Sequence, residues 1–91
     1  MSTEAINSIF KLDHATIKAI QAKVGAKADG MIGAETIKKL QEFLNSENSA
    51  GLAEDGKFGV NTIKALQTYV GVTADGAFGP LTADAIKTKF A

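Results

Sequence analysis

The sequence predicts an all-α protein: a compact bundle of about five short helices built from duplicated helix–turn–helix halves. The pattern Asp-Gly-x-[apolar]-Gly-x-x-Thr occurs three times, in residues 29–36, 55–62 and 75–82. Apolar residues recur at helical spacing after each of these turns, whereas strand patterns are nearly absent. A chain of 91 residues can build a single core. We therefore expect one domain over residues 1–91.

Each copy of the pattern is expected to lead the chain into a helix. Asp-Gly favours a tight turn, because Asp can hydrogen-bond nearby backbone and Gly accepts a positive φ. The second Gly falls at the helix N-cap and the Thr at the third helical position. In the third copy Pro80 takes the first helical position, which suits its fixed φ. The apolar residue of each copy is expected to plug the core; these are Ile32, Phe58 and Phe78.

The helices can be placed in chain order from their apolar spacing and their end signals. The first three are expected at residues 3–10, 13 to about 24 and about 34–44. The polar residues 45–50 are expected to form a loop. The fourth helix follows the second turn and is ended by Gly71, and the fifth follows the third turn.

The chain is also self-similar over a longer span. Residues 16–36 recur as residues 62–82, with Val-Gly, Ala-Asp-Gly, Gly and Thr at matching places. This predicts two repeated halves, 13–44 and 59–90. Each half is too small to bury its own apolar face, so the two are expected to share one core.

Composition excludes several classes of function. Ten basic and ten acidic residues cancel and no basic cluster is present, so nucleic acid is not an expected partner. The absence of Cys and the single His14 argue against a metal site, and no cofactor is predicted. No apolar run approaches the roughly 20 residues that span a bilayer, so we expect no membrane insertion. Because the first residues lack the pattern of a secretory signal, we expect synthesis in the cytoplasm without a signal peptide.

Two of the turns occur with a further motif. The turns 55–62 and 75–82 are preceded by the pairs Leu40-Gln41 and Leu66-Gln67. In these motifs, residues 37–86 resemble the peptidoglycan-binding domain found beside the catalytic domains of bacterial and phage cell-wall hydrolases. The resemblance implies an all-helical fold and non-catalytic binding of the stem peptide and amino sugar of bacterial peptidoglycan.

The candidate ligand-binding residues belong to the turns and to matched helix positions. Clustered turns and helix N-termini present backbone N–H groups that suit a peptide carboxylate or an N-acetyl group, and a tyrosine ring can stack on a sugar. Each also has a structural alternative: Asp and Gly shape the turns, duplication explains the recurring Gln, and a Tyr can be half-buried. The candidates are Asp29, Gly30, Gln41, Asp55, Gly56, Gln67, Tyr69, Asp75, Gly76 and Thr82.

An enzyme is not expected. One His, no Cys nucleophile and carboxylates at exposed-looking positions provide no catalytic set. We expect a stand-alone, phage-derived wall-targeting protein that binds cell-wall peptidoglycan fragments, at the cell wall or in a phage particle. The alternative is a cytoplasmic small-ligand-sequestering, protein-interaction or structural protein that reuses the same helical scaffold.

Overall fold

The structure is a computed structural model, and it describes residues 14–90. Within this range the chain is all-helical and contains no strand, which confirms the predicted fold class for the described part. The helices are α2 (His14–Val24), α3 (Ala34–Asn48), α4 (Val60–Val70) and α5 (Pro80–Phe90). The expected first helix at residues 3–10 lies outside the described residues.

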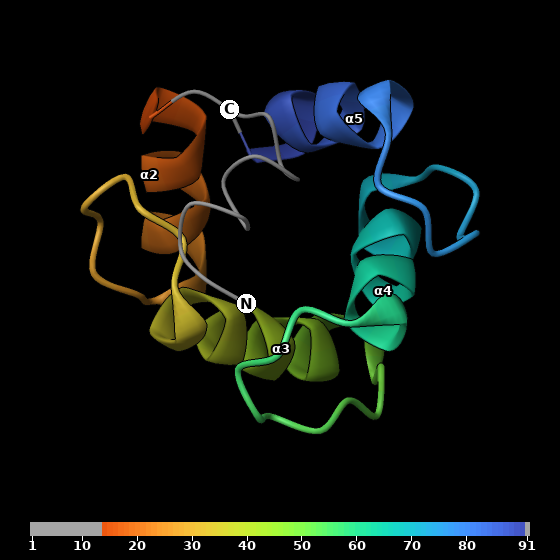
Figure 1. Ribbon diagram of the computed structural model, residues 1–91, viewed down its shortest axis with the longest axis horizontal. Coiled ribbons are helices and arrows are strands. Elements are labelled where there is room, and N and C mark those ends of the chain that lie inside the picture. The colour runs from red at the N-terminus through yellow and green to blue at the C-terminus, as the bar shows by residue number, and fades with distance from the viewer. Residues whose placement is uncertain (1–13, 91) are drawn as a thin grey trace.

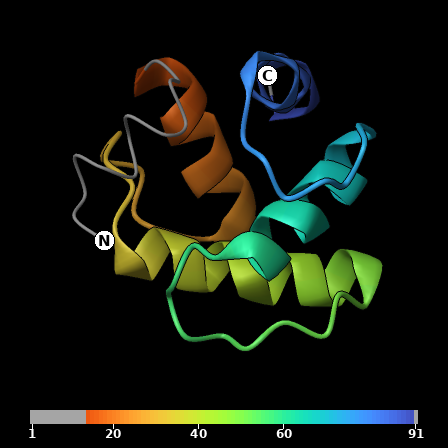
Figure 2. The same ribbon diagram turned by 45° about the vertical axis from the view of Figure 1, so that its right-hand side comes forward.

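The four helices follow one another around a ring (Figure 1). Each helix packs against the next, and α5 returns to pack against α2. Figure 2 shows α2 rising steeply from α3 on one side of this ring. The fold is compact, with a radius of gyration of 11.5 Å.

The core fills the inside of the ring and unites all four helices. Each Leu, Ile or Phe side chain that is fully buried stabilises the fold by roughly 1.5–3 kcal/mol. Ile32 and Phe58 are buried, as predicted for the core plugs, while Phe78 is half-buried and packs edge-on against Phe58 with ring centroids 6.2 Å apart. The buried cluster consists of Ile17, Ile20, Ile32, Ile37, Leu40, Leu44, Phe58, Leu66, Ile86 and Phe90.

The predicted helix ends are confirmed at the starts of α3, α4 and α5 and at the end of α4. Gly33 and Gly59 are N-caps with extended backbone, and Pro80 is the first residue of α5. Gly71 ends α4 in the left-handed region, with φ 86°, and its N–H donates to the carbonyls of Gln67 and Thr68. Glycine adopts this conformation without a Cβ clash, which makes it suited to end a helix.

The predicted end of α3 is wrong. Residues 45–48, expected to belong to a loop over residues 45–50, form the last turn of α3, and Ser49 caps the helix with φ 51°. Polar composition suggested a loop because Asn and Ser compete with helical hydrogen bonds. Here Asn45 instead uses its side chain to bind the backbone of Leu52, so the helix continues through it.

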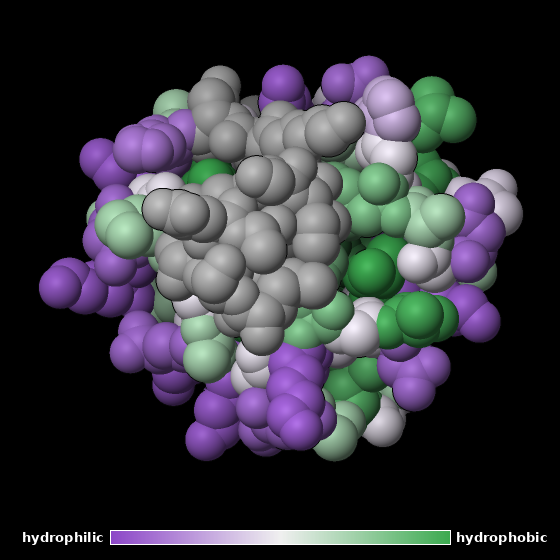
Figure 3. Space-filling model, in the orientation of Figure 1, coloured by the Kyte–Doolittle hydropathy of each residue, from purple (hydrophilic) through white to green (hydrophobic). Residues whose placement is uncertain are grey.

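The described surface is unevenly apolar. On the face drawn in Figure 3, hydrophilic residues predominate along the α2 and α3 side, whereas apolar residues lie among hydrophilic ones on the α4 and α5 side. Three large apolar side chains are exposed, Met31, Val60 and Leu81, the last with 79% of its surface accessible. Among residues 14–90, no helix has the length and apolar character needed to cross a membrane.

Candidate functional site

The third turn shows how the repeated pattern folds. Gln67 lies inside α4 and is almost fully buried. Its Nε2 donates to the carboxylate Oδ1 of Asp75 at 2.9 Å, to the carbonyl of Ala77 at 2.9 Å and to the hydroxyl of Thr82 at 3.1 Å. Its Oε1 accepts the backbone N–H of Gly76 at 2.9 Å. One side chain therefore joins the helix before the turn to the turn itself and to the start of α5.

Gln21 and Gln41 hold the first and second turns through the same four hydrogen bonds, all between 2.9 and 3.1 Å. A side-chain amide has two N–H hydrogens, so its three acceptors must share them. The amide orientation is fixed because Nε2 faces acceptors and Oε1 faces a donor. We call each set of Gln, Asp, Gly and Thr a glutamine clamp.

Each clamp also stabilises the charged form of its aspartate. The backbone N–H two residues after the Asp donates to the carboxylate Oδ1, and the clamp glutamine donates to the same oxygen. These hydrogen bonds, the backbone one first, hold the pKa of the carboxyl below its ordinary value in all three turns. The aspartates concerned are Asp29, Asp55 and Asp75.

The clamped turn also lies close to the start of the helix before it. Gly76 has φ 77°, and a Cβ added there would come within 2.9 Å of Cγ1 of Val60, the first residue of α4. Gly56 is similar, because an added Cβ would meet the carbonyl oxygen of Ala34, the first residue of α3, at 3.0 Å. Glycine is therefore required twice over, by the positive φ and by the close approach.

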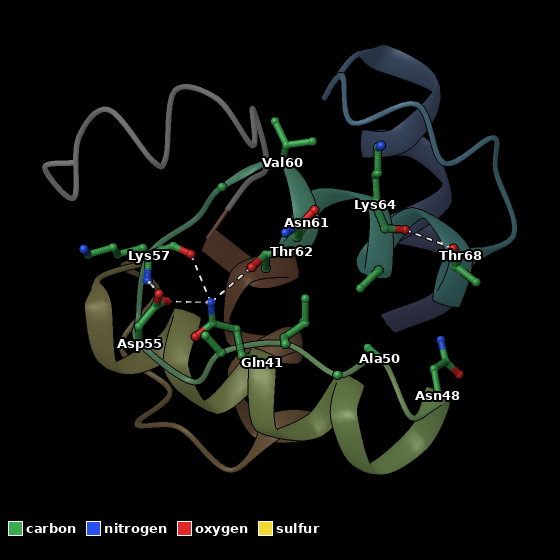
Figure 4. A pocket seen from close by; sticks show the side chains of 15 residues that line it. Gln41, Asn48, Ala50, Asp55, Lys57, Val60, Asn61, Thr62, Lys64 and Thr68 are labelled. Atoms are coloured by element: carbon green, nitrogen blue, oxygen red, sulfur yellow. Dashed lines mark hydrogen bonds between the residues drawn. The ribbon is translucent and has the colours of Figure 1, made fainter.

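A groove of about 550 Å³ lies against the second clamp. One wall is the loop after α3, and the other is α4 from Val60 to Thr68 (Figure 4). Ala50 and Leu52 contribute apolar surface from the loop. Asn61, Lys64 and Thr68 contribute polar groups from α4. A concave surface of this size with mixed lining suits a small or extended ligand.

The groove exists because the second turn is longer than the others. Fourteen positions separate Gln41 from Asp55, whereas eight separate the clamp glutamine from its aspartate in the other two turns. Residues 50–53 lie in this longer connection and line the groove. Asn45 fixes the connection: its Nδ2 donates to the carbonyl of Leu52 at 2.9 Å, and its Oδ1 accepts the N–H of Leu52 at 2.7 Å.

A smaller groove of about 280 Å³ lies at the equivalent place on the first turn. Asp29, Met31, Glu35 and Thr36 line it, and the matching positions of the second turn line the larger groove. Where the second turn has Asn61, the first has the acidic Glu35. The repeated scaffold therefore forms a shallow recess twice, and the longer connection deepens one of the two.

The candidate residues do not converge on one site. Gln41, Gln67 and Thr82 are buried and hydrogen-bonded within clamps, so ligand contact by their side chains is not supported. Gln41 and Asp55 line the larger groove, and Asp29 lines the smaller one. The remaining candidates shape turns, apart from Tyr69; these are Gly30, Gly56, Asp75 and Gly76.

Tyr69, in the last turn of α4, belongs to an aromatic cluster with Phe43 and Phe90. Its ring packs edge-on against Phe43 with centroids 5.2 Å apart, lies 5.7 Å from Phe90, and has Nζ of Lys89 5.0 Å from its centroid. Burial, and then the charge of Glu47, raises the pKa of the Tyr69 hydroxyl. Tyr69 does not line either groove.

Sequence reasoning missed most of the groove. Leu52, Asn61 and Lys64, which line it, were not among the candidates, and neither was Asn45, which fixes its wall. The candidates rest on features that the three turns share, whereas the groove depends on how they differ. The extra length between Gln41 and Asp55 was the signal that could have found them.

Across residues 14–90, no group of His, Cys, Asp and Glu side chains is arranged to hold a metal ion. Comparisons of the chain with models of protein families, with curated proteins and with solved structures gave no match.

Proposed function

We propose that this protein binds bacterial peptidoglycan without cleaving it, through the groove on the second clamp. The observation that carries the proposal is that the longer connection, fixed by Asn45, builds a groove of about 550 Å³ on a turn whose sequence resembles that of peptidoglycan-binding domains. The groove is preformed, since the clamp on one side and Asn45 on the other hold its walls. Preformed sites lose less conformational entropy on binding.

The lining of the groove matches the chemistry of wall fragments. Stem peptides carry free carboxylates, and Lys57 and Lys64 place cations at the groove. The first residues of α4 also line it, and the N–H groups at a helix start favour negative charge. Ala50, Leu52 and Ala65 offer apolar surface to the methyl groups of alanine and N-acetyl substituents.

The wider proposal concerns how the protein works as a whole. In it the chain is built from two duplicated halves and acts as a wall-targeting protein of phage origin. Binding is weak for a single groove, because the site is shallow and few hydrogen bonds are available. No part of the proposal needs catalysis, a cofactor, nucleic acid or membrane insertion.

Sedimentation with purified sacculi tests the proposal. The protein is expected in the pellet, and the variant Lys64→Glu is expected to shift about tenfold or more toward the supernatant, because a charge of the wrong sign repels the carboxylates. Lys38→Glu is the matched control: Lys38 occupies the same position on α3, is also exposed, and lines neither groove. Recovery of the unmodified protein entirely in the supernatant would overturn the proposal.

A titration of soluble muropeptides identifies the site. Amide resonances of Leu52, Asn61 and Lys64 are expected to shift, whereas those of the aromatic cluster around Tyr69 stay in place. Shifts confined to Tyr69 and its neighbours would keep peptidoglycan as the ligand but move the site away from the groove.

A protein-interaction role is the second candidate, favoured by one observation. Leu81, at the second position of α5, is 79% exposed, although the equivalent positions in α3 and α4 are the polar Glu35 and Asn61. An exposed large apolar side chain suits contact with another protein. Light scattering that shows a monomer at all concentrations, together with binding to sacculi, would remove self-association as the main function.

A further inference from the structure

Asp-Gly dipeptides are chemically reactive. The glycine nitrogen can attack Cγ of the preceding aspartate, forming a C–N bond while the carboxyl hydroxyl leaves as water, and a five-membered succinimide results. One water molecule then opens the ring at the main-chain carbonyl and leaves the chain running through the side chain, as isoaspartate. This protein has three such dipeptides, at residues 29–30, 55–56 and 75–76, and all three aspartates are exposed to solvent.

We propose that the three Asp-Gly dipeptides are latent isoaspartate sites, and that each is held closed by its clamp glutamine. The clamp glutamines would then slow isoaspartate formation in addition to stabilising the fold; they are Gln21, Gln41 and Gln67. The inference is independent of the peptidoglycan proposal, because it rests on the clamps alone. It follows from the fact that one glutamine contacts both groups that would have to react.

The first of the two reacting groups is the backbone nitrogen of the glycine, and the clamp glutamine holds it by a hydrogen bond. In every clamp the glycine N–H donates to Oε1 of the glutamine at 2.9 Å. This nitrogen must give up its proton as the new bond forms, and it must turn toward Cγ of the aspartate. A hydrogen bond to a buried acceptor opposes both steps, since breaking it leaves the glutamine oxygen without that partner in the interior.

The carboxyl is held as well. Its Oδ1 accepts one hydrogen bond from Nε2 of the glutamine and another from the N–H two residues on, at 2.9–3.1 Å in the three turns. Both bonds favour the carboxylate, and they hold its pKa below the ordinary value. A carboxylate is a poor electrophile, because the reaction needs a protonated oxygen to leave as water. Figure 4 shows this grip on Asp55 in the second turn, with Gln41 reaching Thr62 as well.

The repetition supplies its own controls. Replacing one glutamine should release one dipeptide and leave the other two clamped in the same molecule. In Gln67→Met, isoaspartate at Asp75 is expected to form about tenfold faster than in the unmodified protein, because several hydrogen bonds that oppose local opening are lost. The rates at Asp29 and Asp55 are expected to stay unchanged. Gln21→Met should move the effect to Asp29.

The measurement is peptide mapping by mass spectrometry with fragmentation that distinguishes isoaspartate, after incubation for days in mild buffer. Thr82→Val is the matched variant: it removes an acceptor of Gln67 but leaves the contacts to Gly76 and Asp75, so little additional isoaspartate is expected. Unmodified protein in urea should react at all three dipeptides, and faster than in native buffer.

Two results would overturn the proposal. The first is that native and urea-unfolded protein form isoaspartate at equal rates. The second is that a glutamine variant reacts equally at all three dipeptides, or not at all above the unmodified protein. Circular dichroism in native buffer shows whether Gln67→Met folds. If it does not, Gln41→Met takes its place, and isoaspartate should then rise at Asp55 alone.

Discussion

The backbone nitrogen of Gly76 lies 2.9 Å from Oε1 of Gln67 and donates a hydrogen bond to it. A residue inside α4 thereby fixes the turn that follows that helix. The same glutamine reaches Thr82 in the first turn of α5, so helix, turn and next helix are joined through one buried amide. Because the arrangement occurs three times, each connection around the ring from α2 to α5 is held in the same way.

Loss of one clamp should destabilise the protein strongly. In Gln67→Met the hydroxyl of Thr82 and the N–H of Gly76 lose their partner in the interior, and each unsatisfied buried group costs about 1–3 kcal/mol. We expect the free energy of unfolding to fall by about 3 kcal/mol in urea titrations followed by circular dichroism. Thr68→Ala, at the adjacent exposed position, should change it by less than about 0.5 kcal/mol. Equal losses in the two variants would show that the clamp contributes little.

Substitutions at three glycines distinguish the cost of backbone strain from the cost of steric contact in the free energy of unfolding. Gly25→Ala introduces strain alone, because its φ is 83° and an added Cβ meets nothing within 4 Å; we expect a loss of about 1 kcal/mol. Gly76→Ala adds a contact of 2.9 Å with Val60 and should lose more. Gly59→Ser has neither problem and supplies a better N-cap, so it should be neutral or slightly stabilising. The order of the three unfolding free energies is the measurement, and a reversed order of Gly25→Ala and Gly76→Ala would contradict it.

The helices were predictable because their signals are local. Pro80 at a first position, Gly71 past a last one and Ile32 as an apolar plug act through φ or through burial, which the sequence shows directly. The last turn of α3 was missed for the opposite reason. There the side chain of Asn45 hydrogen-bonds the backbone of Leu52, seven positions further on, and no local sequence pattern shows such a contact.

The candidate site was predicted less well, and the cause is also physical. A recurring glutamine such as Gln41 marks an equivalent position in each turn, but recurrence does not distinguish a ligand contact from a buried clamp. Four hydrogen bonds to one amide can be recognised only when the turn is seen beside the helix. The groove, in turn, depends on the greater length of the second connection, between Gln41 and Asp55, which the other two turns lack.

The connection that walls the groove should depend on Asn45. In Asn45→Ala, the amide of Leu52 loses its acceptor, and its hydrogen exchange should speed up about tenfold as this segment opens. The amide of Gly71, bound to carbonyls of α4, is the internal reference and should not change. Ser46→Ala, at the next and exposed position, is the matched variant. Unchanged exchange at Leu52 would mean that the loop keeps its shape without this side chain.

Acid should weaken the protein through its three turns. Asp29, Asp55 and Asp75 have a lower pKa in the folded chain than carboxyls ordinarily have, so below that ordinary value, about 4, the unfolded chain binds more protons. Stability is therefore fully present above this pH, and it is lost as the pH falls from there through the lowered folded values. We expect the urea midpoint to be level near neutral pH and to fall as the solution is acidified below about pH 4.

In freshly purified Asp75→Asn the fall in the urea midpoint should be smaller, because an amide oxygen still accepts the N–H of Ala77 but does not titrate. Asp84→Asn removes an exposed carboxylate outside the turns, so its urea midpoint should fall as that of the unmodified protein does. If the midpoint of Asp75→Asn falls as steeply as that of Asp84→Asn, the clamped carboxylates do not govern acid stability.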